Sequence, residues 1–223
     1  MDRYEVLCYG DSNTWGCIPR WEESELPSER YGPDVRWPCV AASLLGPDYH
    51  LIEEGLGGRT TIYDRPDAHW LNGLPYLKPC LLTHRPLDLV ILSLGTNDLL
   101  TWVQPEFADL DKGIRTLVDV VQSTPQCGRK GEPPQILLLS PTHIKPALGR
   151  TGVYGKFRGD VGRAKNEALS KLYRQVAAEK GCGFLDLAQL TEPSDADGVH
   201  LTREAHLILA PAIAKAISQS LRP

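Results

Sequence analysis

The sequence lacks the features that would mark a nucleic-acid or membrane protein. Lys and Arg number 24 against 28 Asp and Glu, a formal net charge of −4, so no basic excess is present for contacts with phosphates. The most apolar stretches, residues 87–94 and 207–217, are too short or too interrupted to span a bilayer. Nor does an apolar signal segment with a small-residue cleavage site follow Met1. We therefore expect a cytoplasmic protein without a nucleic-acid or membrane partner.

Paired cysteines are also missing. The six cysteines form no C-x-x-C motif and stand near no cluster of histidines, which argues against a structural zinc site and a disulfide framework. Cys8 lies in the apolar run at residues 6–9 and fits a small buried hydrophobic residue. We expect a protein with neither a metal nor a cofactor.

What is present is the composition of a soluble globular chain. Of the 223 residues, 42% are hydrophobic and 23% charged, and a chain of this length can bury a full core. No internal repeat and no linker-like shift in composition divide the sequence. Residues 1–223 are therefore expected to form one domain.

Short apolar runs alternate with segments of helical period. Five runs fit buried strands: residues 5–9, 50–53, 87–94, 135–139 and 183–186. Apolar stripes, which include Val161 and Ile208, predict helices over residues 107–121, 161–176 and 205–217, and a shorter helix is predicted over residues 37–45. This alternation predicts an α/β fold with a five-stranded parallel sheet between two helical layers.

Three long stretches rich in proline and glycine interrupt this alternation. They span residues 17–34, 124–134 and 140–160. Loops of that length in a compact domain usually cover a site or a partner surface.

The residues that directly follow the strands are the first candidates for chemistry, because ligands bind at this edge of a doubly wound sheet. Gly10-Asp11-Ser12 follows the first strand, and Ser12 is either an ordinary helix cap or a nucleophile. Residues 54–61, after the second strand, carry glycines whose N–H groups can face a ligand. A phosphate cradle is a weaker alternative there, since no established phosphate-binding spacing is present.

An amide and an acid–imidazole pair complete the set. Asn97, after the third strand, is either a turn residue or a donor to an oxyanion. Asp197 stands three residues before His200, so its carboxylate can hold the imidazole while the other ring nitrogen faces outward. Together with Ser12, these groups are what acyl transfer needs. No G-x-S-x-G motif surrounds Ser12, so the α/β-hydrolase fold is not indicated.

These blocks, in this order, resemble those of the SGNH, or GDSL, hydrolase superfamily. The resemblance is carried by GDS at residues 10–12, the glycines of GLGGRTT at 55–61, GTND at 95–98 and DGVH at 197–200. The surrounding sequence, including CYGDSNTWG, is similar to the bacterial arylesterase and acyltransferase branch. The resemblance implies a three-layer flavodoxin-like fold and a metal-free serine esterase for small acyl groups. It also implies acyl transfer to alcohols and homo-oligomers in which loop 17–34 walls the entrance.

The resemblance implies a role for each matching residue. Ser12 resembles the nucleophile, and Asp197 and His200 resemble the other members of its triad. Gly58 and Asn97, together with the backbone N–H of Ser12, resemble the donors of the oxyanion hole.

The substrate pocket is assigned to three residues beside these blocks. Asn13 stands where the family's motif has leucine, which predicts a more polar acyl pocket. Trp15 and Val199 are the other pocket candidates, and core packing fits each of them equally well.

Other functions use the same residues or the same fold. A carbohydrate O-acetylesterase or a thioesterase would share the catalytic groups, and Asn13 slightly favours a polar sugar ester. A flavodoxin-like module that binds nucleotide or flavin, or a scaffold protein, needs no triad. Asp197 and His200 argue against both of these non-enzymatic alternatives.

Overall fold

The fold is a five-stranded parallel sheet, seen in a computed structural model that describes residues 3–24, 26–103 and 106–221. The strand order is β2-β1-β3-β4-β5, the order of flavodoxin-like doubly wound sheets. The strands are β1 (Tyr4–Gly10), β2 (Tyr49–Gly55), β3 (Leu89–Ser93), β4 (Gln135–Ser140) and β5 (Gly183–Asp186). The predicted α/β class is confirmed, and each predicted strand is found within a few residues of its expected ends.

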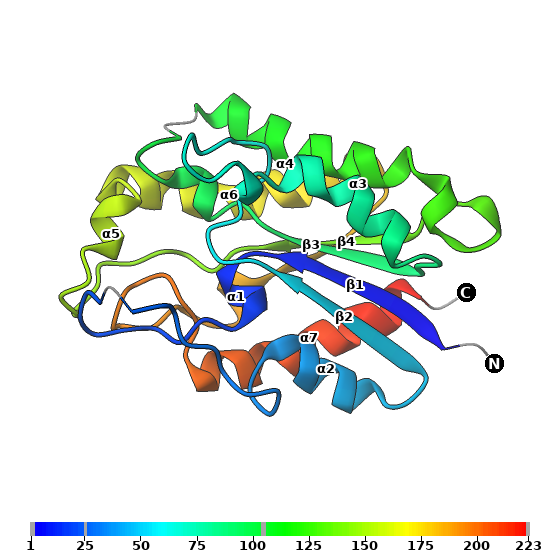
Figure 1. The fold of residues 1–223 in the computed structure, drawn as a ribbon, viewed down its shortest axis with the longest axis horizontal. Coiled ribbons are helices and arrows are strands. Elements are labelled where there is room, and N and C mark those ends of the chain that lie inside the picture. The colour runs from blue at the N-terminus through cyan, green and yellow to red at the C-terminus, as the bar shows by residue number, and fades with distance from the viewer. Residues whose placement is uncertain (1–2, 25, 104–105, 222–223) are drawn as a thin grey trace.

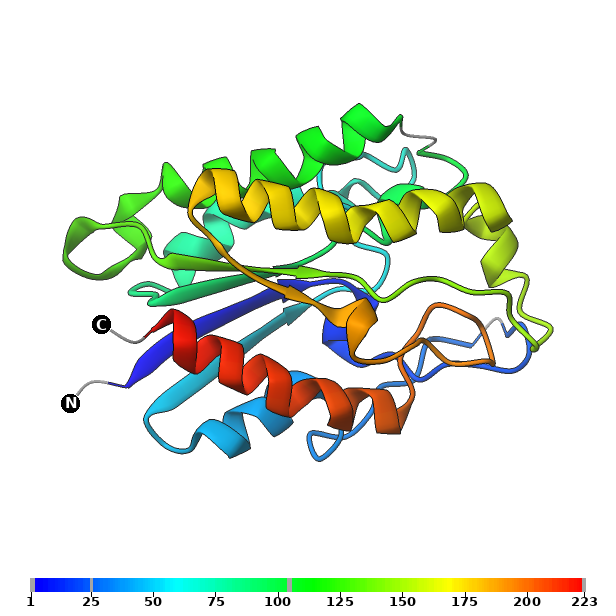
Figure 2. The ribbon, with the colours of Figure 1, turned by 180° about the vertical axis from the view of Figure 1, so that it is seen from behind.

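Helices cover both faces of the sheet (Figures 1 and 2). One face carries α3 (Gly73–Thr83), α4 (Phe107–Gln122) and α6 (Gly159–Lys180), and the other carries α2 (Trp37–Leu45) and α7 (Arg203–Ser220). Two helices of a single turn, α1 (Ser12–Trp15) and α5 (Val153–Lys156), lie near the carboxyl ends of the strands. Short 3-10 turns lie at His69–Leu71, Asn97–Leu99, Pro125–Cys127, Arg129–Gly131 and Leu187–Gln189. None of the described helices has the length and apolarity needed to cross a bilayer.

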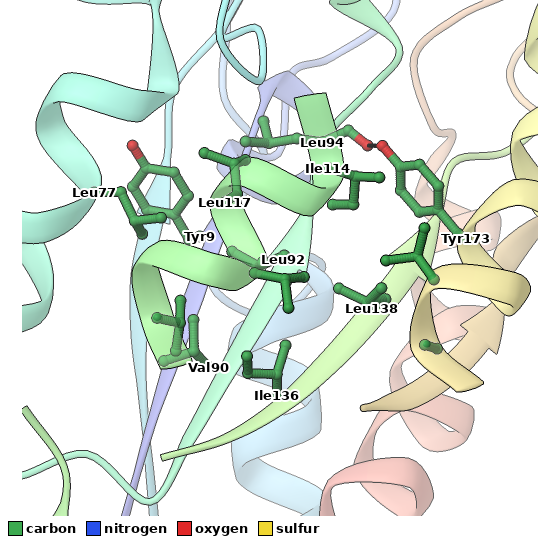
Figure 3. Packing of buried hydrophobic residues seen from close by; sticks show 14 of the residues in the cluster. Tyr9, Leu77, Val90, Leu92, Leu94, Ile114, Leu117, Ile136, Leu138 and Tyr173 are labelled. Atoms are coloured by element: carbon green, nitrogen blue, oxygen red, sulfur yellow. Dashed lines mark hydrogen bonds between the residues drawn. The ribbon is translucent and has the colours of Figure 1, made fainter. Parts of the chain in front are cut away.

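Alternate residues of each strand supply the two hydrophobic layers. Leu7 and Tyr9 of β1 face α3, α4 and α6, while Val6 and Cys8 face α2 and α7. Figure 3 shows the first layer, in which the Tyr173 hydroxyl donates to the Leu94 carbonyl at 2.9 Å. A polar group is thus buried in the core with its hydrogen bond made.

Three positions of the predicted apolar stripes are exposed, among them Ala164 in the stripe over residues 161–176. Ile208 is 52% exposed and Val161 is 54% exposed. In α7 the neighbouring His206 is buried instead, and its Nδ1 accepts a hydrogen bond from the Trp37 N–H at 3.3 Å. An imidazole with a backbone partner at the start of α2 therefore replaces the aliphatic side chain in this part of the layer.

Helix α3 was not anticipated from the sequence. It contains Pro75 and Pro79, and the second of these stands inside the helix. Proline removes a backbone donor and weakens the helical signal. Burial of Leu77 and Leu81 against the sheet stabilises the helix in spite of these prolines.

The carboxyl ends of the strands gather the candidate residues at one end of the molecule. In the register, Gly10 pairs with Gly55 on one side and with Ser93 on the other, so the loops after β1, β2 and β3 meet. The described ends of the chain, residues 3 and 221, and loop 124–134 lie at the opposite end (Figures 1 and 2). Of the three long loops, only 17–34 and 140–160 therefore border the candidate site.

Candidate active site

Ser12 begins α1 directly after β1. The Asp11 side chain caps the helix by accepting from the Asn13 N–H at 2.9 Å. A Cβ at Gly10 would stand 2.0 Å from the Thr14 hydroxyl, so this turn requires glycine. The chain therefore leaves the sheet in a tight turn that places Ser12, 8% exposed, at the sheet edge.

The loop after β2 lies beside Ser12. The Leu56 N–H donates to the Gly10 carbonyl at 3.1 Å, which fixes the start of the loop to the end of β1. Gly58 has φ +80°, a left-handed conformation that favours glycine. The Asn97 amide donates to the Arg59 carbonyl at 3.1 Å, so the loops after β2 and β3 are tied together.

Asp98 also holds the loops after β2 and β3 together through hydrogen bonds from Thr61. It accepts from the Thr61 N–H at 2.8 Å and from the Thr61 hydroxyl at 2.6 Å. Burial raises the pKa of Asp98 to about 7 and that of Asp11 to about 6. Neither carboxylate was singled out in the sequence, although each directly neighbours a predicted site residue.

Asp197 and His200 form a hydrogen-bonded pair. The His200 Nδ1 lies 2.7 Å from the Asp197 Oδ2, and the other carboxylate oxygen accepts from the N–H groups of Val199 and His200 at 3.0 and 2.9 Å. Gly198 has φ +75°, and a Cβ there would stand 1.9 Å from the Lys145 carbonyl. The tight turn therefore aims the carboxylate at the ring and leaves Nε2 as the ring nitrogen for a proton transfer.

Burial and neighbouring groups act in opposite directions on this pair. Burial acts to lower the pKa of His200, whereas the hydrogen bond to Asp197 and the adjacent Cys17 thiol act to raise it. The two groups outweigh burial, so the pKa of His200 lies above the usual value for histidine. Burial acts to raise the pKa of Asp197, but its hydrogen bonds from His200 and Val199 keep it below the usual value. Both shifts favour a charged pair, which is the state that a general base reaches when it takes a proton.

Asn13 connects helix α1 to the segment that carries this pair. Its Nδ2 donates to the Val199 carbonyl at 3.2 Å, and its Oδ1 accepts from the Leu201 N–H at 3.0 Å. Both polar ends of the side chain are therefore used to hold the backbone on either side of His200.

A cavity of about 540 Å³ joins the candidate residues. It is lined by Ser12, Trp15, Cys17, Pro27, Ser28, Leu56, Gly57, Gly58, Asn97, Leu100, Phe157, Val199 and His200. Two of the three predicted pocket residues, Trp15 and Val199, belong to this lining, whereas Asn13 does not. Cys17 is a lining residue that was interpreted from the sequence only as one of six unpaired cysteines.

A second, smaller cavity of about 210 Å³ is also lined by His200. Its lining includes charged groups from both long loops, among them Arg20, Glu22 and Lys156. Lys156 pairs with Glu23 at 2.8 Å, so an ion pair joins loop 17–34 to α5 near His200. The site therefore offers one mainly apolar cavity and a second that several charged side chains line.

Among the residues that the structure describes, no group of metal-binding side chains gathers at Ser12. Within the part of the chain that the structure describes, the one group of three side chains with converging ligand atoms is Glu54, Cys80 and His84. None of these residues lines either cavity.

Comparison with known proteins agrees with the geometry. Residues 8–208 match the model of the GDSL-like lipase/acylhydrolase family. The structure is similar to the aryl esterase of M. smegmatis, with 36% identity and a TM-score of 0.91 over 98% of this chain and 100% of that one. It is also similar to Est24, a carbohydrate acetylesterase from Sinorhizobium meliloti, with 36% identity and a TM-score of 0.89 over 97% and 99% of the two chains. Comparison with curated proteins gave no match.

A third similar structure is a putative arylesterase from Agrobacterium tumefaciens, with 32% identity and a TM-score of 0.82 over 98% of this chain and 100% of that one. The family model covers most of the chain, and these similarities extend over nearly all of it. The protein therefore belongs to the GDSL-like lipase/acylhydrolase family and is a carboxylic ester hydrolase.

Proposed function

We propose that the protein hydrolyses short-chain esters of aryl alcohols through an acyl-enzyme on Ser12. The observation that carries the proposal is one apolar cavity lined by Ser12, His200, Gly58 and Asn97. Its similarity to the M. smegmatis aryl esterase supports an aromatic group as the occupant of this cavity.

The first step is attack on the ester carbonyl. His200 Nε2 takes the Ser12 hydroxyl proton as the oxygen bonds to the carbonyl carbon. Asp197, already bonded to Nδ1 at 2.7 Å, fixes the ring tautomer and stabilises the imidazolium. His200 then gives the proton to the departing alcohol oxygen, which leaves the acyl group on Ser12.

The charge that develops on the carbonyl oxygen is stabilised by donors held in place beforehand. The Asn97 amide has two N–H groups, and one of them already donates to the Arg59 carbonyl. The second N–H, with the backbone N–H groups of Gly58 and Ser12, serves the oxyanion. Water activated by His200 then releases the acid, whereas an alcohol in its place gives acyl transfer.

Labelling followed by mutation tests this proposal. A fluorophosphonate probe should modify Ser12 in the wild-type chain and fail to modify Ser12→Ala. Ser12→Ala and His200→Ala should each remove most of kcat on an aryl acetate, and the double variant should be little worse than either, because the two groups act as one unit. Single losses that multiply in a folded double variant would overturn the mechanism.

A second candidate, carbohydrate O-acetylesterase, is favoured by the charged cavity beside His200. Glu22, Glu23 and Lys156 there can bind the hydroxyl groups of a sugar alcohol, and Est24 is a carbohydrate acetylesterase of similar structure. Comparison of kcat/KM for an aryl acetate and for acetylated xylose separates the two candidates. A thioester of the same acyl group tests the thioesterase alternative in the same assay.

We also propose a homo-oligomer and a cytoplasmic location. Trp21, Leu26 and Leu148, on the loops around the entrance, are 60%, 73% and 75% exposed, which supports contact with a second copy. None of the six cysteines, all within the described residues, is in a disulfide, in keeping with a reducing compartment. Analytical ultracentrifugation of wild type and Trp21→Lys tests the first proposal.

A further inference from the structure

Three side chains with metal-binding atoms converge beside helix α3, away from Ser12. Glu54 stands near the end of β2, Cys80 lies in α3, and His84 directly follows the helix. A carboxylate oxygen, the thiol sulfur and a ring nitrogen of these residues all lie within 4.8 Å of one another.

The backbone explains the convergence. The His84 N–H donates to the Cys80 carbonyl at 3.1 Å, so the helical turn continues and the two side chains share one face at i, i+4 spacing. This is the spacing that places two ligands of one metal ion on a helix. Glu54 on the edge strand β2 completes the group, with its Oε1 at 2.9 Å from the His84 Nε2.

The burial of the three residues is graded. Cys80 is 1% exposed, whereas the side chains of Glu54 and His84 are 19% and 26% exposed. The Cys80 sulfur therefore lies on the buried side of the group, and the Glu54 and His84 side chains face solvent in part. Tyr76, whose hydroxyl lies 3.3 Å from the Glu54 Oε1, stands on this partly exposed side.

The local charge suits a divalent cation. A Cys80 thiolate and the Glu54 carboxylate together carry two negative charges. The nearby Arg59 guanidinium carries one positive charge, and it is held by the Gly10 carbonyl at 3.0 Å and by the Tyr9 ring, with its Cζ 4.2 Å from the ring centroid. Before binding, Cys80 is a thiol because burial raises its pKa to about 12, so the Glu54 and Arg59 charges cancel. With a divalent ion bound and the thiol proton lost, the net charge of the group is +1.

We propose that Glu54, Cys80 and His84 bind a divalent metal ion of the Zn²⁺ class at a site separate from the ester-hydrolysing cavity. Thiolate, imidazole and carboxylate are the ligands that Zn²⁺ takes in proteins, and water or the Tyr76 hydroxyl supplies the fourth. The ion replaces the Cys80 thiol proton, which leaves to solvent, and no group changes oxidation state. Ligands at about 2.0–2.3 Å from one ion stand at most about 4.6 Å apart, so rotations of Glu54 and His84 close the site.

Binding of the probe ion Co²⁺ tests the assignment directly. A cobalt–thiolate bond gives a charge-transfer absorption band, and equilibrium dialysis with metal analysis counts the ions bound. Wild type should bind one Co²⁺ or Zn²⁺ per chain and show the band. Cys80→Ala should lose the band, and His84→Ala and Glu54→Gln should each weaken binding at least tenfold.

Three control variants separate this site from other thiols and imidazoles. Cys17→Ala removes the thiol beside His200, Cys182→Ala removes a half-buried thiol, and His69→Ala removes an exposed imidazole. All three should retain the band and the stoichiometry. A wild-type chain without the band, or a band that disappears with Cys17 or Cys182 and survives in Cys80→Ala, would overturn the proposal.

Stability provides a second readout that does not depend on the buried cysteine variant. Because the ion would join β2 to α3 only in the folded chain, Zn²⁺ should raise the Tm of wild type in a concentration-dependent way. Because His84 is partly exposed, His84→Ala should fold and lose the Zn²⁺-dependent rise in Tm. His69→Ala should keep that rise. An equal rise in both variants would show that the ion binds elsewhere.

Discussion

At the scale of single residues, the Asn97 amide is the most direct test of electrostatic stabilisation. Asn97→Ala should lower kcat by roughly a hundredfold to a thousandfold with a much smaller change in KM, because the lost donor acts mainly in the transition state. Steady-state kinetics on an aryl acetate measures both constants, with a thermal melt to check folding. A change confined to KM would mean that Asn97 only binds the substrate.

Cys17 is a second residue whose role can be separated from packing. Its thiol contacts His200 and contributes to the raised pKa of that imidazole. Cys17→Ala should therefore shift the acid limb of the kcat/KM profile to lower pH. The matched variant Cys182→Ala, in the short segment between α6 and β5, should leave the limb in place. An unchanged limb in Cys17→Ala would assign the shift to Asp197 alone.

At the scale of elements, α1 and the 199–201 segment are joined by the two hydrogen bonds of Asn13. Asn13→Ala removes both and should cost about 1–3 kcal/mol of unfolding free energy, together with a loss of kcat as His200 is positioned less firmly. Asn13→Asp keeps the acceptor for the Leu201 N–H and should lose less of each. Urea unfolding and kinetics measure the two effects, and a stable but inactive Asn13→Ala would instead indicate direct contact with substrate.

Periodicity predicted the elements better than it predicted what each element buries. The strands and α2 follow from short apolar runs and a proline in the first helical turn, which are local signals. The burial of His206 in place of Ile208 depends on the Trp37 N–H, from a distant part of the chain. The α3 helix depends on the sheet that Leu77 packs against, so its prolines concealed it.

For the candidate site too, residues in short sequence motifs were predictable, whereas residues that only the fold brings together were not. Ser12, Asn97, Asp197 and His200 lie in short motifs, so their candidacy is visible in the sequence alone. The pairing of Glu54 with Cys80 and His84 requires α3 beside β2, which no motif encodes. The i, i+4 spacing of Cys80 and His84 is the one signal in the sequence, and it differs from the C-x-x-C spacing of common zinc sites.

At the scale of the whole molecule, ester hydrolysis and metal binding occupy separate places. Prolonged treatment with a chelator should therefore leave kcat on an aryl acetate unchanged, because no step at Ser12 uses a metal. The same treatment should remove any Zn²⁺-dependent rise in Tm. A loss of turnover that only a divalent ion restores would contradict the metal-free serine mechanism.

The pH dependence of the whole protein joins activity to stability through His200. Catalysis needs the neutral imidazole, and the pKa of His200 is raised above its usual value, so kcat/KM should rise with pH along a limb centred above about 6.5. Stability should move the other way. A group whose pKa is higher in the folded chain contributes fully below its unfolded pKa, and this contribution is lost as pH rises through the folded value.

The expected outcome is thus a pair of opposed trends in one pH window. The free energy of unfolding of wild type minus that of His200→Ala should be largest below about pH 6.5 and should shrink as pH rises. In the same window, kcat/KM of wild type should climb. Asp197 does not reverse this trend, because its lowered pKa confines its own loss of stability to lower pH. Urea unfolding of both chains across the window measures the difference, and a difference that grows with pH would show that His200 is neutral in the folded protein throughout.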